Sequence, residues 1–176
     1  MLRDFVEIIG IDPVSSFPAL IAAEKFTQFT TEETLIIPEQ KPDIEQITSL
    51  MVEASITDYR AIATPTGLKV IINGELNQKV IYTADEPTQA VHSAHFVKQF
   101  CTFIEIPLVL PAGTSALQLL QSLGLTLDDV LASPPNVIIE DISVKLVDGR
   151  TVKKCVVMFA WGTVNAALVP FFPPVP

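Results

Sequence analysis

The sequence predicts an all-β protein, an antiparallel β-sandwich or partly open barrel with a short helical insert and extended terminal arms. Three observations carry this prediction. Residues 48–58 alternate apolar and polar side chains, as a half-buried strand does. Two longer β-like segments, 68–82 and 90–106, flank a short polar turn. A second pair, 136–147 and 150–161, is separated by an Asp-Gly dipeptide that is typical of hairpin turns.

The first 34 residues are predicted to form an arm outside the core. Residues 5–9 have the composition of a short strand or a helical turn, and Pro13 and Pro18 interrupt anything longer. Because this arm is apolar, it should pack on its own domain or on a neighbour. The charged segment IPEQKPDIEQI (residues 37–47) then holds the chain extended and leads it into the first long strand. We interpret it as a structural junction and not as an active site.

Short turns are expected to join the central strands. Residues 65–67 predict a turn, with a glycine available for a positive φ. Gly74 lies inside the next strand and predicts a bulge or a sharp coil of the sheet. A polar turn at residues 85–88 then leads into the strand that Pro107 ends.

A change of period at about residues 113–135 predicts a helical insert within the β domain. Leucines recur there three residues apart, which suits one face of a helix, and Thr114 or Ser115 can cap its first turn. Residues 125–131 are expected to form a second, short helix.

The last two strands are expected to pair through a type I′ turn at Asp148-Gly149, since this dipeptide suits positive φ values. Residues 164–176 contain four prolines and are predicted to form an extended tail, not a helix. The β domain itself is therefore expected to span residues 35–163.

Composition excludes several classes of partner. The net charge is −9, and no block of Lys or Arg is present to neutralise phosphates, so neither nucleic acid nor an anionic membrane surface is an expected partner. No apolar run is long enough for a transmembrane helix. The start MLRDFVEIIG carries Asp4 and Glu7, which does not suit a secretion signal, so we expect a protein made without a signal peptide.

A search for catalytic or metal-binding groups finds no convincing set. His92 and His95 are the only histidines, and their spacing on a strand directs them to opposite faces. Cys101 shares a face with His95 but lies roughly 20 Å further along the strand, too far for a local nucleophile and base pair. Glycine-rich phosphate loops, dinucleotide fingerprints and calcium loops are absent from the sequence. We therefore expect no enzyme, no catalytic residue, no cofactor and no metal.

The two cysteines, Cys101 and Cys155, are too few for a disulfide scaffold, and their spacing matches no zinc motif. Buried free thiols are the favoured interpretation. A disulfide within one chain or between chains is the alternative.

Several segments together resemble a known family, the SPOCS domain. The resemblance extends roughly over residues 24–162, and its most specific parts are IPEQKPDIE and the central hairpin. The segments that carry it are LIIPEQKPDIEQI (35–47), VEASITD (52–58), KVIINGELNQKVIY (69–82), VHSAHF (91–96) and FCTFIEIP (100–107).

The resemblance implies structural biology and not catalysis. SPOCS domains occur in spore-forming Firmicutes, often in proteins of the spore coat and its assembly machinery. Some members tether the coat through a peptidoglycan-binding LysM module, and no such module is recognised here, so we do not expect that role. The insert at 113–135 is also longer than the loop expected in the family. The resemblance implies synthesis in the mother-cell cytoplasm and a place in the endospore surface layers.

The sequence therefore predicts a non-enzymatic structural subunit of an endospore outer layer, such as the coat, the exosporium or a spore appendage. Its expected partner is itself, in a filament or lattice built through sheet edges and terminal arms, with other spore coat proteins as further candidates. The alternative is an adaptor domain that docks another coat protein without polymerising. The candidate self-assembly residues are Phe5, Val6, Ile8, Ile9, Phe171 and Phe172, and the candidate intermolecular disulfide residues are Cys101 and Cys155.

Overall fold

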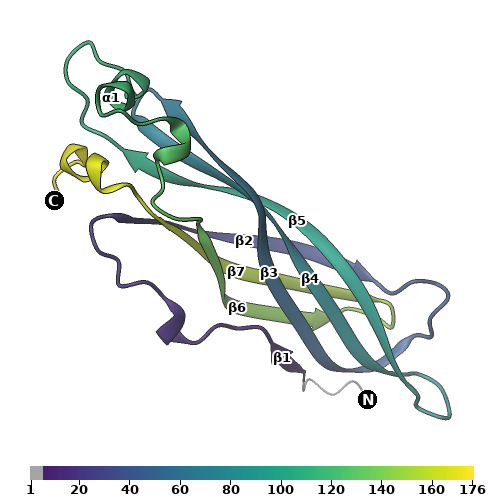
Figure 1. Ribbon diagram of the computed structural model, residues 1–176. Helices are drawn as coiled ribbons and strands as arrows, with labels where there is room; N and C mark the ends of the chain where they lie inside the picture. The colour runs from purple at the N-terminus through teal and green to yellow at the C-terminus, as the bar shows by residue number, and fades with distance from the viewer. Residues whose placement is uncertain (1–5) are drawn as a thin grey trace.

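Alternation of buried and exposed side chains organises residues 6–176, the part of the chain that the computed structural model describes, into two facing β-sheets (Figure 1). Sheet A has the spatial order β1 (Glu7–Ile9), β3 (Ile44–Thr64), β4 (Gly67–Ala84) and β5 (Val91–Pro107). Sheet B has the order β2 (Glu24–Ile36), β7 (Thr151–Thr163) and β6 (Asn136–Leu146). The pairs are antiparallel except for β1 with β3. The predicted β-sandwich is confirmed, and the sheets do not close into a barrel.

The core lies between the central strands of the two sheets. Every even-numbered residue of β4 from Leu68 to Ala84 is buried, and so is every even-numbered residue of β7 from Val152 to Gly162. Since side chains alternate along a strand, these two rows face each other across the sandwich. Most of the core is aliphatic, but Gln78 and Lys154 place one polar layer inside it.

The bulge predicted at Gly74 is confirmed, with the extra residue on the neighbouring strand. Ile56 pairs with Gly74 and Asp58 with Asn73, so β3 accommodates one more residue than β4 at this point. A side chain at position 74 would meet the Phe100 ring and the Ser55 carbonyl. Glycine therefore allows the Phe100 ring to lie directly on the backbone of β4.

The predicted helical insert is also present. The helix α1 (Ala116–Ser122) begins at Ser115, whose Oγ accepts from the Gln118 backbone N–H at 3.2 Å. The Gln118 side chain in turn accepts from the Ser115 N–H at 2.8 Å, which completes a capping box. A 3₁₀ turn, Leu127–Asp129, replaces the second short helix. Together they cover one end of the sandwich (Figure 1).

The N-terminal arm is shorter than predicted, because residues 24–34 belong to β2 and pair with β7 along its whole length. The expected boundary at residue 34 is therefore wrong. The inner face of β2 carries polar Thr27, Thr31 and Glu33, so it lacks the apolar alternation that indicates a strand in sequence.

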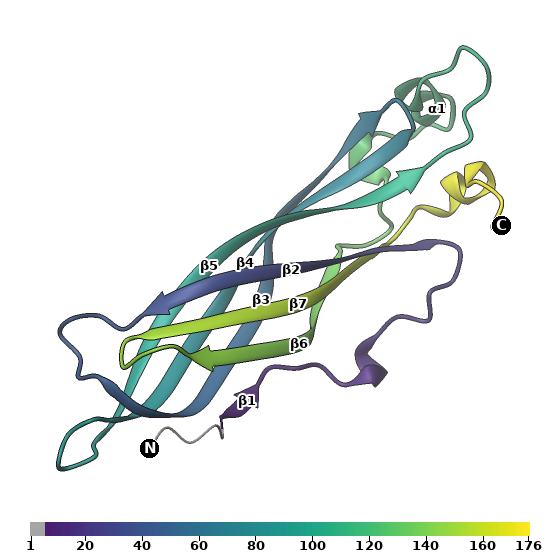
Figure 2. The ribbon, with the colours of Figure 1, turned by 180° about the vertical axis from the view of Figure 1, so that it is seen from behind.

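The remaining arm closes one side of the sandwich. β1 adds to the edge of sheet A beside β3, and Asp12 bonds to β6 of sheet B. The Asp12 N–H donates to the Ile139 carbonyl at 2.9 Å, and the Ile139 N–H donates to Asp12 Oδ2 at 2.8 Å. Further along, Phe17 lies edge-on to Phe159 on the outer face of sheet B. The arm thus runs along β6 towards the start of β2 (Figure 2).

The C-terminal residues are not fully extended, contrary to the prediction. Ala166–Phe171 form a 3₁₀ helix that Asn165 caps through the Ala167 N–H. A 3₁₀ helix bonds residues three apart, so Pro170 removes only the bond that its own N–H would make. Burial of Leu168 against the insert end of the core favours this compact turn.

The Asp148-Gly149 hairpin is confirmed, but the type I′ turn is wrong. Val147 N–H donates to the Thr151 carbonyl at 2.8 Å, so three residues form the loop, and Gly149 does not have a positive φ. Asp148 Oδ1 accepts from the Arg150 N–H at 2.8 Å. From this loop the Arg150 side chain reaches residues 37–43, which link the two sheets.

That crossover, residues 37–43, carries the chain from β2 in sheet B to β3 in sheet A, and Arg150 holds it. The guanidinium donates to the carbonyls of Ile37 (3.3 Å), Pro38 (3.1 Å) and Lys41 (2.9 Å) and pairs with Asp43 Oδ1 at 2.7 Å. The segment IPEQKPDIEQI is therefore a junction between the two sheets.

Replacing Arg150 should loosen this junction. Arg150→Lys retains the charge but loses the planar fork that reaches several carbonyls, so we expect the free energy of unfolding to fall by about 2 kcal/mol. Urea titration followed by circular dichroism measures the loss. The same substitution at exposed Arg60 is the control, and equal effects at the two positions would contradict the role of Arg150.

Candidate functional site

The described residues offer no metal centre. Within residues 6–176, no group of three or more His, Cys, Asp or Glu side chains is placed to hold a metal ion. Nor does this part of the chain contain a helix long and apolar enough to cross a bilayer.

The two histidines lie on opposite faces of β5, as their spacing predicts. His92 stacks on the Tyr82 ring at 5.8 Å between centroids. His95 is exposed on the outer face of sheet A, in register with Lys79. The fold does not bring the two imidazoles together.

Both cysteines are free thiols on outer faces of the sandwich. Cys101 is exposed on β5 of sheet A, and Cys155 is half-buried on β7 of sheet B. The expectation of buried thiols is wrong for Cys101, because odd-numbered residues of β5 point away from the core. Since the core separates the two faces, a bond between Cys101 and Cys155 within one chain is excluded. A disulfide between chains stays a prediction.

The candidate residues of the N-terminal arm are divided between core and surface. Phe5 lies outside the described residues. Val6 and Ile8 are half-buried and pack on the core of the same chain. Ile9 points outwards and is 39% exposed. β1 therefore adds a strand to its own sheet in this structure.

The candidate residues of the C-terminal tail also contact their own domain. Phe171 and Phe172 are half-buried against the insert end of the core. The Phe171 carbonyl accepts from the Val109 N–H at 2.7 Å, and the Lys25 ammonium lies 4.2 Å from the Phe172 ring centroid.

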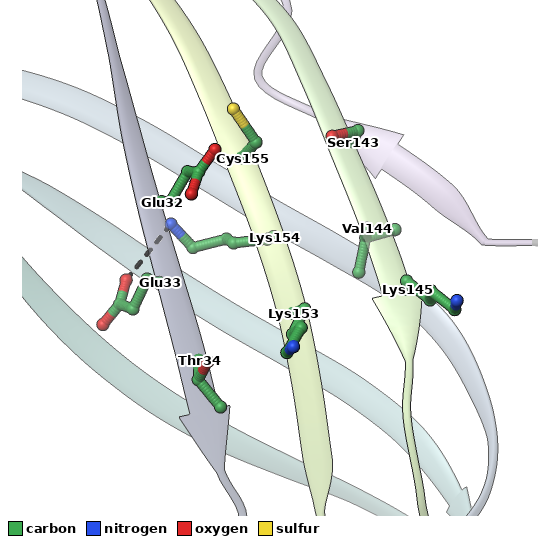
Figure 3. Close-up of a pocket in the computed structure, with 9 residues that line it drawn as sticks. All are labelled: Glu32, Glu33, Thr34, Ser143, Val144, Lys145, Lys153, Lys154 and Cys155. Carbon is green, nitrogen blue, oxygen red and sulfur yellow. Dashed lines mark ion pairs between the residues drawn. The ribbon is translucent and has the colours of Figure 1, made fainter.

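Two surface hollows of about 480 Å³ each lie on the sheets. One, on sheet A, is largely apolar and includes Ile9, Met51 and Val97 beside His95. The other, on sheet B, is charged (Figure 3). In it, Lys153 of β7 lies directly opposite Lys145 of β6, and the residues lining it are Glu32, Glu33, Thr34, Ser143, Val144, Lys145, Lys153, Lys154 and Cys155.

Lys154 extends from this hollow into the core. Its side chain is 0% exposed, and its Nζ lies 3.2 Å from Glu33 Oε2 of β2, whose side chain is 16% exposed. Figure 3 shows Lys154 reaching across from β7 to meet Glu33. Burial lowers the pKa of Lys154, and pairing with Glu33 opposes that shift.

Gln78 of β4 completes the polar layer. Its Nε2 donates to the same Glu33 Oε2 at 2.9 Å, although Gln78 and Glu33 belong to different sheets. The buried atoms Gln78 Oε1, Thr31 Oγ1 and Lys154 Nζ make no hydrogen bond of good geometry within the described residues. Sequence reasoning missed this cluster, although a signal existed: Lys154 occupies an inward position between buried Val152 and Val156.

Comparison with known proteins gives one match. The family model described as SipL, SPOCS domain, matches residues 43–115. The search of curated proteins and that of solved structures found no match. The matched region contains β3, β4 and β5, the larger part of sheet A, whereas the strands of sheet B and most of the crossover lie outside it. Over residues 43–115 the chain therefore matches the SPOCS domain family that its sequence resembles, and this match indicates a spore-related protein.

Proposed function

We propose that the protein is a non-enzymatic structural subunit of an endospore outer layer, made in the mother cell, that associates with copies of itself. The layer is the coat, the exosporium or a spore appendage. The SPOCS domain supports the spore context. The exposed edge of β5 is the observation that carries self-association.

β5 is a 17-residue strand at the end of sheet A, and among the described residues no strand pairs with its outer edge. Lys98 and Glu105 are the charged residues in it. β2 crosses close to its middle, where the Phe29 and Phe100 rings lie 5.4 Å apart, and the two strands diverge towards the end that bears α1 (Figures 1 and 2). Long edges with little charge favour pairing with another chain.

Where β5 diverges from β2, towards α1, its outer face is suited to a contact between subunits. Phe103 is 44% exposed, and Cys101 lies two residues before it on the same face. Pairing of such edges between copies would satisfy backbone groups and cover apolar surface at once. Exposed apolar residues of the N-terminal arm, Val14, Leu20 and Ile21, supply a second contact surface.

A second candidate function is an adaptor that docks another coat protein without polymerising. The apolar hollow on sheet A favours it, because Ile9, Met51 and Val97 surround a depression large enough for a partner side chain. The two functions differ in whether the purified chain polymerises alone.

Electron microscopy of the purified full-length protein tests self-association. We expect ordered polymers from the wild-type chain and their loss in Phe103→Glu, because the new carboxylate places charge on the edge strand β5. Within its own chain the carboxylate can pair with Lys69, as Glu105 does at 3.4 Å.

Leu117→Glu, at a similarly exposed position on α1, is the matched control and should polymerise normally. A wild-type chain that stays monomeric at high concentration would reject self-association and leave the adaptor function. Equal loss of polymers in both variants would reject the β5 edge as the contact.

The cysteines provide a separate prediction. If intermolecular disulfides lock the assembly, a variant with both Cys101→Ser and Cys155→Ser should dissolve in denaturant with heat, under conditions in which wild-type polymers persist. Non-reducing electrophoresis should show covalent multimers for the wild type alone. Equal resistance of both kinds of polymer to denaturant and heat would contradict a disulfide between chains.

A further inference from the structure

Three polar side chains from three strands meet at one oxygen inside the core. Glu33 Oε2 of β2 accepts from Gln78 Nε2 of β4 at 2.9 Å and lies 3.2 Å from Lys154 Nζ of β7. A primary amine and a carboxamide are therefore neighbours on a single carboxylate oxygen. Because Glu33 is acceptor-only when ionised, the Gln78 amide must present its nitrogen to it.

Two of the three side chains are buried among apolar neighbours, and Glu33 is 16% exposed at the border of the charged hollow. Gln78 is 3% exposed and the Lys154 side chain 0%, and Val80, Val152 and Val156 nearby are fully buried. A buried ion pair stabilises a protein only when its remaining donors and acceptors are satisfied. Here the ion pair leaves Gln78 Oε1 without a hydrogen-bond partner among the described residues.

We propose that Lys154 and Gln78 react to form an isopeptide bond between Nζ and Cδ, promoted by Glu33. The bond would join β7 of sheet B covalently to β4 of sheet A. It is a modification of the chain by its own side chains, and it is independent of the self-association proposed above.

The first step is proton transfer from the Lys154 ammonium to the Glu33 carboxylate, because only the neutral amine is a nucleophile. Burial lowers the pKa of Lys154 and favours this transfer, and the positive charge of Lys98 on β5 acts in the same direction. The interaction with Glu33 raises the pKa and opposes them.

In the second step Lys154 Nζ attacks Gln78 Cδ and gives a tetrahedral intermediate. The Glu33 carboxyl group then donates its proton to Nε2 and takes one from Nζ. The Cδ–Nε2 bond breaks, ammonia leaves, and the amide between Nζ and Cδ remains. At Cδ one bond forms and one breaks, and no group is oxidised or reduced. The proton from Lys154 remains on Glu33, whose neutral carboxyl group no longer faces an ammonium.

Intact-mass spectrometry of the purified full-length protein tests the proposal. The wild-type chain should weigh one ammonia less than its sequence, and digestion should yield a branched peptide that joins the segments around residues 78 and 154. Lys154→Arg and Glu33→Gln should have the full sequence mass and linear peptides only. Lys98→Arg is the control, since it alters the neighbouring amine but no reacting atom, and it should retain the branch.

The wild-type result decides the proposal even if a variant fails to fold. A wild-type chain of full sequence mass, after prolonged incubation of the folded protein at neutral pH, overturns the bond. So does a loss of ammonia that maps to another pair of residues. A branch that persists in Glu33→Gln overturns the role assigned to Glu33.

Discussion

The arrangement of the sandwich depends on the hydrogen bonds and the ion pair that Arg150 makes with the crossover between the sheets. A chain that leaves sheet B and enters sheet A must expose carbonyls that no strand can satisfy, and one guanidinium binds three of them together with Asp43. Backbone bonds reinforce it, since Ile37 N–H donates to the Arg150 carbonyl and Ile44 N–H to that of Gly149. The junction thus holds the end of β2 and the start of β3 to the β6–β7 hairpin loop.

The polar layer follows from the same topology. β2 forms the edge of sheet B with Glu33 facing inwards before the crossover begins, and β7 beside it contributes Lys154. Gln78 then ties this pair to the centre of sheet A. A polar contact that links both sheets specifies their relative position more narrowly than interchangeable aliphatic contacts would. Aliphatic packing provides the bulk of the burial, and the polar layer adds directionality.

Sheet A could be predicted from sequence because its strands are local and its alternation is clear. Val70 and Ile72 face inwards while Lys69 and Asn73 face outwards, and short turns separate the strands. β2 could not be predicted, because Thr27, Thr31 and Glu33 occupy its inner face. Periodicity predicts which side chains of a strand face the core but not which strand packs against them. The contact between Glu33, Gln78 and Lys154 could therefore not be predicted from sequence. The acceptors of Arg150 are mostly backbone carbonyls, which carry no residue signature.

The pairing of β2 with β7 joins opposite ends of the described chain, since Glu24 lies beside Thr163. The three long strands of sheet A need only local hairpins between residues 44 and 107, and local contacts form quickly. During synthesis, sheet A can therefore assemble early, whereas sheet B must wait until β7 has emerged. In that interval the aliphatic inner face of β4 is uncovered. The newly made chain is therefore most prone to associate with other chains before it has finished folding.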